Sequence, residues 1–188
     1  MAVPPTQALS LIGYFPKQVE QRPDWLKADR VVAIRSVSDC ISKGPANWIN
    51  QWKHNTMYLY FSEATAESII PEGQRSQFEI HAYRLLPAIF DTGMRMPLEL
   101  PMSDIDPLPA NFASVGFDAV SKLYEFHDSQ FACSPLSCNS MAEEIETNEH
   151  CLLTDLTKAE EVALRFSIEE PEPGPYYVVE VLRRVETQ

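Results

Sequence analysis

Residues 176–184 read YYVVEVLRR, and this stretch most clearly predicts a β-strand, because β-branched and aromatic residues dominate it. Residues 158–169, KAEEVALRFSIE, precede it and place their apolar side chains at helical spacing. Thr157 and Glu160 fit a capping box at the start of that helix. Prolines between 171 and 175 predict a rigid turn after it. The C-terminal part of the chain is therefore expected to form a helix followed by a strand.

Outward from this region, short strands and short helices are intermixed along the chain. A strand or short helix is expected over residues 30–37, and strands over 8–15, 57–61, 77–90, 115–123 and 151–153. Further helices are expected after Ser62 and Ser140, because each hydroxyl can cap a first helical turn. The elements do not alternate strictly, which favours an α+β fold with a mixed or mainly antiparallel sheet.

The length of 188 residues predicts a single compact domain over residues 1–188. No internal repeat is apparent in the sequence. Residues 94–110 carry four prolines and little periodicity, so they are expected to form a long loop or lid.

The charge of the chain bears on its partners. It has 27 acidic and 15 basic residues, a formal net charge of −12. Such a surface repels phosphate backbones and anionic headgroups, which disfavours nucleic-acid and membrane partners and favours a basic protein partner. No stretch is apolar enough to span a bilayer, and the N-terminus has no signal-peptide pattern. We therefore expect a cytoplasmic protein with reduced thiols.

These features favour an acidic intracellular domain that acts by binding a protein, in a regulatory, inhibitory or immunity-type role. Trp48 and Trp52 lie four residues apart in an expected helix over 46–53 and are the candidate partner-binding residues. No glycine-rich phosphate loop is present, and no cofactor is predicted for this reading.

The alternative is an enzyme, and the stretch from 131 to 151, FACSPLSCNSMAEEIETNEHC, is where thiol chemistry could lie. Cys138 precedes the helix expected after Ser140, and a helix N-terminus favours the thiolate form. His127 and His150 are the candidate bases for a Cys138 nucleophile.

A metal site in the same stretch is disfavoured. Cys133 and Cys138 have the spacing of zinc ligands, and His150 and Cys151 could complete a set of four. However, adjacent residues on a strand point to opposite faces, so His150 and Cys151 are not expected to bind one ion. We therefore predict no metal ligands from the sequence.

A second enzyme alternative comes from a resemblance. The segment 148–181 reads as strand, helix and strand, an order similar to that of bacterial ADP-ribosyltransferase-like folds. The resemblance covers only this segment and implies an enzyme that uses NAD, commonly with a late Glu at the ribose. Glu180 is the late strand carboxylate that matches. Without this function, Glu180 is expected to be solvated on the outer face of an edge strand.

Overall fold

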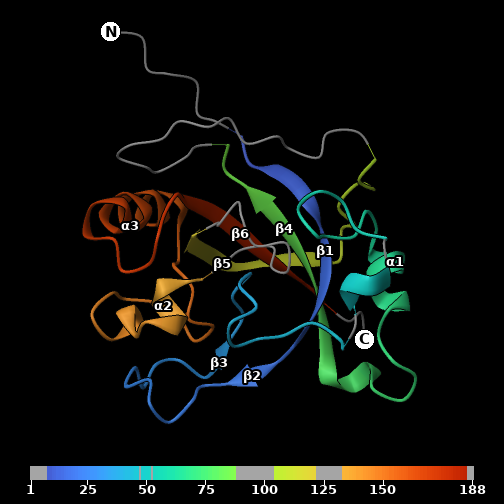
Figure 1. The fold of residues 1–188 in the computed structure, drawn as a ribbon, viewed down its shortest axis with the longest axis horizontal. Coiled ribbons are helices and arrows are strands. Elements are labelled where there is room, and N and C mark those ends of the chain that lie inside the picture. The colour runs from blue at the N-terminus through green and yellow to red at the C-terminus, as the bar shows by residue number, and fades with distance from the viewer. Residues whose placement is uncertain (1–7, 47, 52, 88–103, 122–132, 186–188) are drawn as a thin grey trace, which may run out of the picture.

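The centre of the molecule is a four-stranded antiparallel sheet with the strand order β1-β4-β6-β5 (Figure 1). Its strands are β1 (Ser10–Gln18), β4 (Phe78–Leu85), β5 (Phe112–Ser121) and β6 (Tyr176–Arg184). The computed structural model describes residues 8–46, 48–51, 53–87, 104–121 and 133–185. The short strands β2 (Glu20–Gln21) and β3 (Ala33–Ile34) form a separate two-stranded sheet. The predicted single α+β domain with a mainly antiparallel sheet is confirmed.

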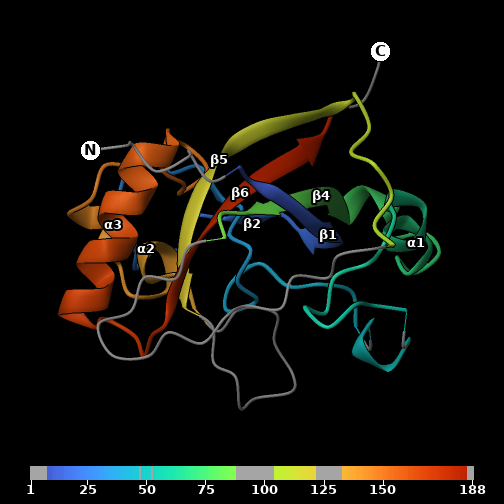
Figure 2. The same ribbon diagram turned by 90° about the horizontal axis from the view of Figure 1, so that it is seen from above.

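Short helices flank the sheet at its two ends, as Figures 1 and 2 both show. Helix α1 (Glu63–Ser68) packs on β1 and β4, and α3 (Leu156–Glu169) packs on β5 and β6. The remaining helical elements are α2 (Pro135–Cys138) and the 3₁₀ turns η1 (Trp48–Gln51), η2 (Arg75–Gln77) and η3 (Met141–Glu143). No helix in the described part of the chain is both long and apolar enough to cross a membrane.

The sheet is built from two halves of the same design. Each half runs from an outer strand through an asparagine turn and a capped helix to an inner strand: β1, α1 and β4 in one half, β5, α3 and β6 in the other. The halves meet where Tyr83 pairs with Val181. Gly13 pairs with Tyr83 in the first half, and Gly116 pairs with Val181 in the second. An approximate two-fold axis therefore passes near the Tyr83–Val181 pair.

Asn55 and Asn148 play the same part in the two halves. The Nδ2 of Asn55 donates to the carbonyl of Ile12 at 2.8 Å, and that of Asn148 donates to the carbonyl of Val115 at 2.7 Å. The Oδ1 of each accepts two backbone N–H groups, two and four residues further along the chain. Each side chain thus fastens its turn to the outer strand of its own half.

Gly13 and Gly116 complete the repeated motif. Both sit at a bulge with φ near +140°, a conformation that essentially only glycine adopts. A Cβ at Gly13 would lie 2.6 Å from the Cβ of Leu59, and one at Gly116 would lie 2.7 Å from the Cβ of Leu152. The expectation of no internal repeat was therefore wrong. The repeat consists of a few positions, Asn-x₃-Leu-x₂-Ser/Asp-x₃-Ala, at 55–66 and 148–159.

The helix caps agree only in part with expectation. Ser62 caps α1 as predicted, because its side chain accepts from the N–H of Thr65 at 3.0 Å. Asp155, and not Thr157, caps α3 by accepting from the N–H of Lys158 at 2.8 Å. The prediction of a helix after Ser140 is wrong, because only the 3₁₀ turn η3 forms there. Ser140 has φ 60° and its side chain makes no capping hydrogen bond.

Two further expectations concern Trp48 and the proline-rich loop. Trp48 is 9% exposed and packs edge-on against Phe15, so the structure places it in the core and not on a partner surface. Trp52 lies outside the described residues, as do residues 94–103 of the loop. The described end of the loop is attached to the core, since Tyr14 Oη donates to the carbonyls of Asp106 and Pro107 at 3.0 and 3.1 Å.

Candidate functional site

Three cysteines meet between the two halves of the fold, and we call them the three-cysteine cluster. The sulfur atoms of Cys40, Cys133 and Cys138 all lie within 4.8 Å of one another. Cys40 belongs to the connection that follows β3, Cys133 pairs with Ser121 at the end of β5, and Cys138 ends α2. The sequence predicted the importance of Cys133 and Cys138 but missed Cys40, which is remote from them along the chain.

A buried lysine holds the loop that carries Cys40. Lys17 is fully buried, and its Nζ donates to the carbonyls of Val37, Ser38 and Ser42 at 3.0, 2.8 and 2.9 Å. The same ammonium forms an ion pair with Asp39. A buried charge is tolerated only when it is paired and hydrogen-bonded. The loop therefore wraps around Lys17, which fixes the backbone on both sides of Cys40.

A buried aspartate holds the other side of the cluster to the same loop. Asp118 is fully buried on β5, and its Oδ2 accepts from Ser36 Oγ at 2.6 Å and from the N–H of Val37 at 3.1 Å. Its Oδ1 accepts from Ser134 Oγ at 2.6 Å. Because Ser134 follows Cys133 and Val37 belongs to the loop that carries Cys40, one carboxylate ties the two segments that carry these thiols to each other.

The three thiols alter one another's proton affinity. Hydrogen bonds from Cys133 and Cys138 hold the pKa of Cys40 well below its usual range. The pKa of Cys133 is raised by Cys138 and Cys40 and by burial. The pKa of Cys138 is also raised, since the effects of Cys40 and burial outweigh a lowering effect of Cys133. The protein alone therefore stabilises one thiolate, at Cys40, and keeps two protons on the other sulfurs.

This arrangement suits one thiophilic cation. Zinc binds cysteine sulfur at about 2.3 Å in tetrahedral geometry, which separates two sulfur ligands by about 3.8 Å. The sulfurs of the cluster already lie within 4.8 Å of one another, so small side-chain movements bring them to that separation. This group differs from the ligand set considered from the sequence, because it contains Cys40 beside Cys133 and Cys138 and does not contain His150 or Cys151.

The structure does not bring the other candidates to this cluster. Cys151 is buried in the core, and burial raises the pKa of its thiol to about 12. His127 lies outside the described residues. Cys138 ends a short helix instead of preceding one, so the proposed help from a helix N-terminus is absent.

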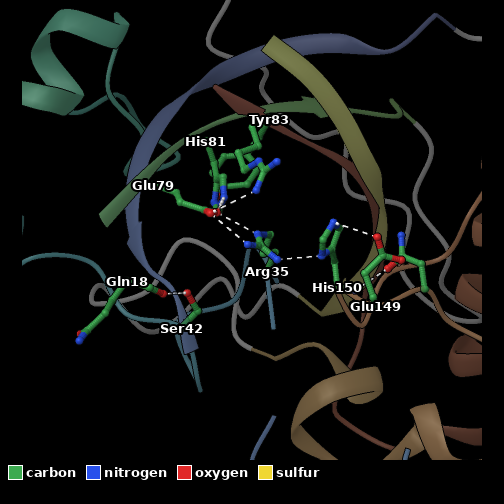
Figure 3. Close-up of polar contacts among 10 residues, drawn as sticks. Gln18, Arg35, Ser42, Glu79, His81, Tyr83, Glu149 and His150 are labelled. Atoms are coloured by element: carbon green, nitrogen blue, oxygen red, sulfur yellow. Dashed lines mark hydrogen bonds and ion pairs between the residues drawn. The ribbon is translucent and has the colours of Figure 1, made fainter. Parts of the chain in front are cut away.

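Glu79 is the centre of a second polar group, which we call the Glu79 hub (Figure 3). Arg35 binds this carboxylate with both ends of its guanidinium, at 2.8 Å through Nε and 3.0 Å through Nη2. His81 donates from Nε2 at 3.2 Å, and Arg183 donates from Nη1 at 3.4 Å. Burial acts to raise the pKa of Glu79, but hydrogen bonds from His81 and Arg35 hold it well below its usual range.

His150 belongs to this hub and not to the cysteines. Arg35 Nη1 donates to His150 Nδ1 at 2.7 Å, and the Nε2 of His150 lies 3.6 Å from Glu149 (Figure 3). An arginine can only donate, so Nδ1 carries no proton and the imidazole is neutral. Burial and the charge of Arg35 both lower the pKa of His150. The Nδ1 lone pair of His150 therefore accepts a hydrogen bond from Arg35 and is not available to take a proton from Cys138 in this arrangement.

A pocket of about 250 Å³ opens beside the hub, where η2 meets the ends of β4 and β6. Its walls include Arg75, Phe78, Glu79, Arg183, Arg184 and Val185. A wider hollow of about 740 Å³ adjoins it and shares Arg75, Phe78, Glu79 and Arg184. No sequence motif indicated this site, because its residues come from separate elements.

Glu180 has different surroundings from those expected. It lies on β6, a central strand, and is 4% exposed. Arg84 Nε donates to its Oε2 at 2.6 Å. The expectation of a solvated carboxylate on an edge strand was therefore wrong. The use of NAD stays a prediction from the resemblance.

Comparisons with protein-family models, curated proteins and solved structures found no match.

Proposed function

We propose that this protein is a metal-binding domain in which Cys40, Cys133 and Cys138 hold one zinc ion. The observation that carries the proposal is the convergence of three sulfur atoms within 4.8 Å of one another. Soft thiolate ligands select zinc, copper(I) or iron–sulfur clusters over hard cations. Bound there, the ion would tie the connection after β3 to the segment that follows β5.

Charge balance favours zinc over copper(I). Three thiolates leave one negative charge on a divalent ion and two on a monovalent one. Lys17 supplies one positive charge close enough to lower the pKa of Cys40. Lys17 is already ion-paired with Asp39, so a zinc site would keep one negative charge, which is one fewer than a copper(I) site would keep. The described residues supply three ligands, which is the number that catalytic zinc sites use beside an exchangeable water or substrate.

The test measures metal in the purified protein and then replaces zinc by cobalt(II). We expect one zinc per chain, and a cobalt spectrum with thiolate charge-transfer bands and the visible bands of a tetrahedral ion. Cys40→Ser should lose part of the charge-transfer intensity and at least about tenfold in affinity. Cys151→Ala, which removes a thiol outside the cluster, should change neither. Equal loss in both variants, or a protein that binds no zinc, would contradict the proposal.

A basic protein partner is a second candidate function, and one surface favours it. Leu164 and Ile168 on α3 are 53% and 67% exposed and line a hollow of about 340 Å³. Glu161 and Glu169 lie at its edge, and Arg165 there is paired with Glu169 and Glu144. We propose that this face binds a basic segment with apolar side chains, since charge and apolar surface complement it.

The partner is sought by affinity capture with wild-type protein and with Leu164→Asp at low and high salt. Capture that is lost in the variant and weakened by salt supports this face, because screening acts on exposed charges. If the Leu164→Asp variant captures the same partner as strongly as wild type does, the partner binds at another surface.

A further inference from the structure

We propose that the arginine pocket beside Glu79 binds the phosphoryl group of a small organic phosphate. This pocket, which we call the arginine pocket, is the hollow of about 250 Å³ lined by Arg75, Arg183 and Arg184. The proposal is independent of the metal site. It rests on the donors that the arginines leave available, on the local charge and on the apolar side of the pocket.

The arginines are held in place by carboxylates behind them. Arg184 Nη1 donates to Glu63 at 2.7 Å and to Glu67 at 2.9 Å. Arg75 Nε donates to Glu67 at 2.7 Å, and its Nη1 donates to the carbonyl of Phe78 at 3.0 Å. Side chains fixed in this way lose little conformational entropy when a ligand arrives, which favours binding.

Several guanidinium donors in the pocket have no acceptor within the described part of the chain. Arg183 makes one contact of 3.4 Å, from Nη1 to Glu79. Its Nε and Nη2 have no acceptor among the described residues. The Nη2 of Arg75 likewise has no acceptor among the described residues. Paired N–H donors in one plane match phosphate oxygens in bidentate geometry. The donors therefore suit a phosphoryl group.

The local charge is positive although the chain is acidic. The ion-pair group at the pocket contains four arginines and three carboxylates. They are Arg35, Arg75, Arg183 and Arg184, and Glu63, Glu67 and Glu79. This group keeps a positive charge in a protein of net charge −12. Field lines concentrate in a concave site, so an anion is drawn to this pocket and repelled elsewhere.

The size and apolar side of the pocket indicate an organic phosphate and not the bare ion. Phe78 and Val185 line the pocket together with the arginines, and Val185 is 44% exposed. The wider hollow of about 740 Å³ adjoins it and offers room for a carbon body. Small-molecule sites commonly combine such an apolar wall with a few placed polar groups.

The test uses phenyl phosphate as the probe, measured by isothermal titration calorimetry on the protein as purified. Benzoate, inorganic phosphate and phenol serve as comparison ligands. We expect phenyl phosphate to bind at least about tenfold more tightly than benzoate, because it carries more charge and more acceptor oxygens. It should also bind more tightly than inorganic phosphate, and higher salt should weaken it. Equal binding of benzoate, or no binding of phenyl phosphate, would overturn the proposal.

Variants locate the site. Arg183→Gln should weaken phenyl phosphate binding at least about tenfold while the protein stays folded, since its side chain is 36% exposed and makes one long contact. Arg165→Gln, an ion-paired arginine on α3, is the matched control and should bind as wild type does. If Arg183→Gln does not fold, Arg75→Gln replaces it, because that side chain is 39% exposed. A folded pocket variant that binds as tightly as wild type refutes the site.

Discussion

Lys17 and Asp118 bind opposite sides of one residue, Val37. The ammonium of Lys17 donates to the carbonyl of Val37 at 3.0 Å, and the carboxylate of Asp118 accepts from its N–H at 3.1 Å. Both charged side chains are fully buried. Buried charges of this kind cost free energy, and replacement by packed apolar residues is often neutral or stabilising. Their presence beside the three-cysteine cluster is accounted for by the loop that they position.

Asp118→Ala should lower both stability and zinc affinity. The N–H of Val37 would lose its acceptor, which costs about 2 kcal/mol in the free energy of unfolding. Zinc affinity should fall about tenfold although all three cysteines remain, as for other residues that orient metal ligands. Asp118→Asn keeps an acceptor and should lose less. Urea unfolding and competitive zinc titration measure the two effects, with exposed Asp29→Ala as control. Loss of stability without loss of zinc affinity would restrict Asp118 to a folding role.

Zinc affinity should rise with pH. The lowered pKa of Cys40 means that this sulfur enters as a thiolate, whereas the raised pKa values of Cys133 and Cys138 mean that both must lose a proton. Two displaced protons increase the apparent affinity by up to about 100-fold per pH unit around neutral pH. Calorimetry in two buffers of different ionisation enthalpy counts the released protons. An affinity that does not change between pH 6.5 and about 7.5 would contradict this thiol assignment.

The protein should lose stability as the pH falls below the ordinary histidine value of 6.5. Burial lowers the pKa of His81, and burial and Arg35 lower that of His150. The unfolded chain therefore takes up protons first, so the stabilisation is present above 6.5 and is lost on acidification. The lowered pKa of Glu79 acts in the same direction at lower pH, whereas burial raises the pKa of Asp118, which acts in the opposite direction.

Urea unfolding across this pH range measures the slope of stability against pH. His81→Gln should make the slope shallower, because it removes one of the two groups. His54→Gln removes a histidine outside the Glu79 hub and is the control for the substitution itself. Identical slopes in all three proteins would exclude the buried histidines as the cause.

Gly116→Ala should destabilise the protein more than Gly73→Ala does. Both glycines have positive φ, but a Cβ at Gly116 would lie 2.7 Å from the Cβ of Leu152, whereas none of the described atoms lies within 4 Å at Gly73. Backbone strain costs about 1 kcal/mol or more in both, and the clash adds to it only at Gly116. The two-fold design predicts a matching loss for Gly13→Ala. Denaturant midpoints measure the stability lost in each variant. Equal losses of stability at Gly73 and Gly116 would show that the contact with Leu152 adds no cost.

The sequence predicted local elements best where composition and spacing were strong. The strand at 176–184 and the Ser62 cap are seen as expected. The segment 57–61 was predicted as a strand from its apolar residues, but it forms only isolated bridges. The repeated asparagine turn sets its path instead. Such a turn depends on a bulged glycine far away in the chain, which periodicity does not show.

Some residues of the candidate sites could be predicted from the sequence, and others could not. The stretch from 131 to 151 directed attention to Cys133 and Cys138, because cysteines gather there. Cys40 was missed, since its approach depends on a loop held by Lys17 and Asp118. The arginine pocket left no sequence signal either, because Arg75, Arg183 and Arg184 come from elements that meet only in the folded sheet.

The sequence by itself determined the α+β class, the acidic character and the position of the best strands, because these follow from composition and from short-range periodicity. Only the tertiary structure decided which thiols share a site, which histidines are occupied, and where positive charge gathers. Those outcomes depend on contacts between residues remote in sequence. Their geometry is fixed by strand pairing across β4 and β6 and by the buried charges of Lys17 and Asp118.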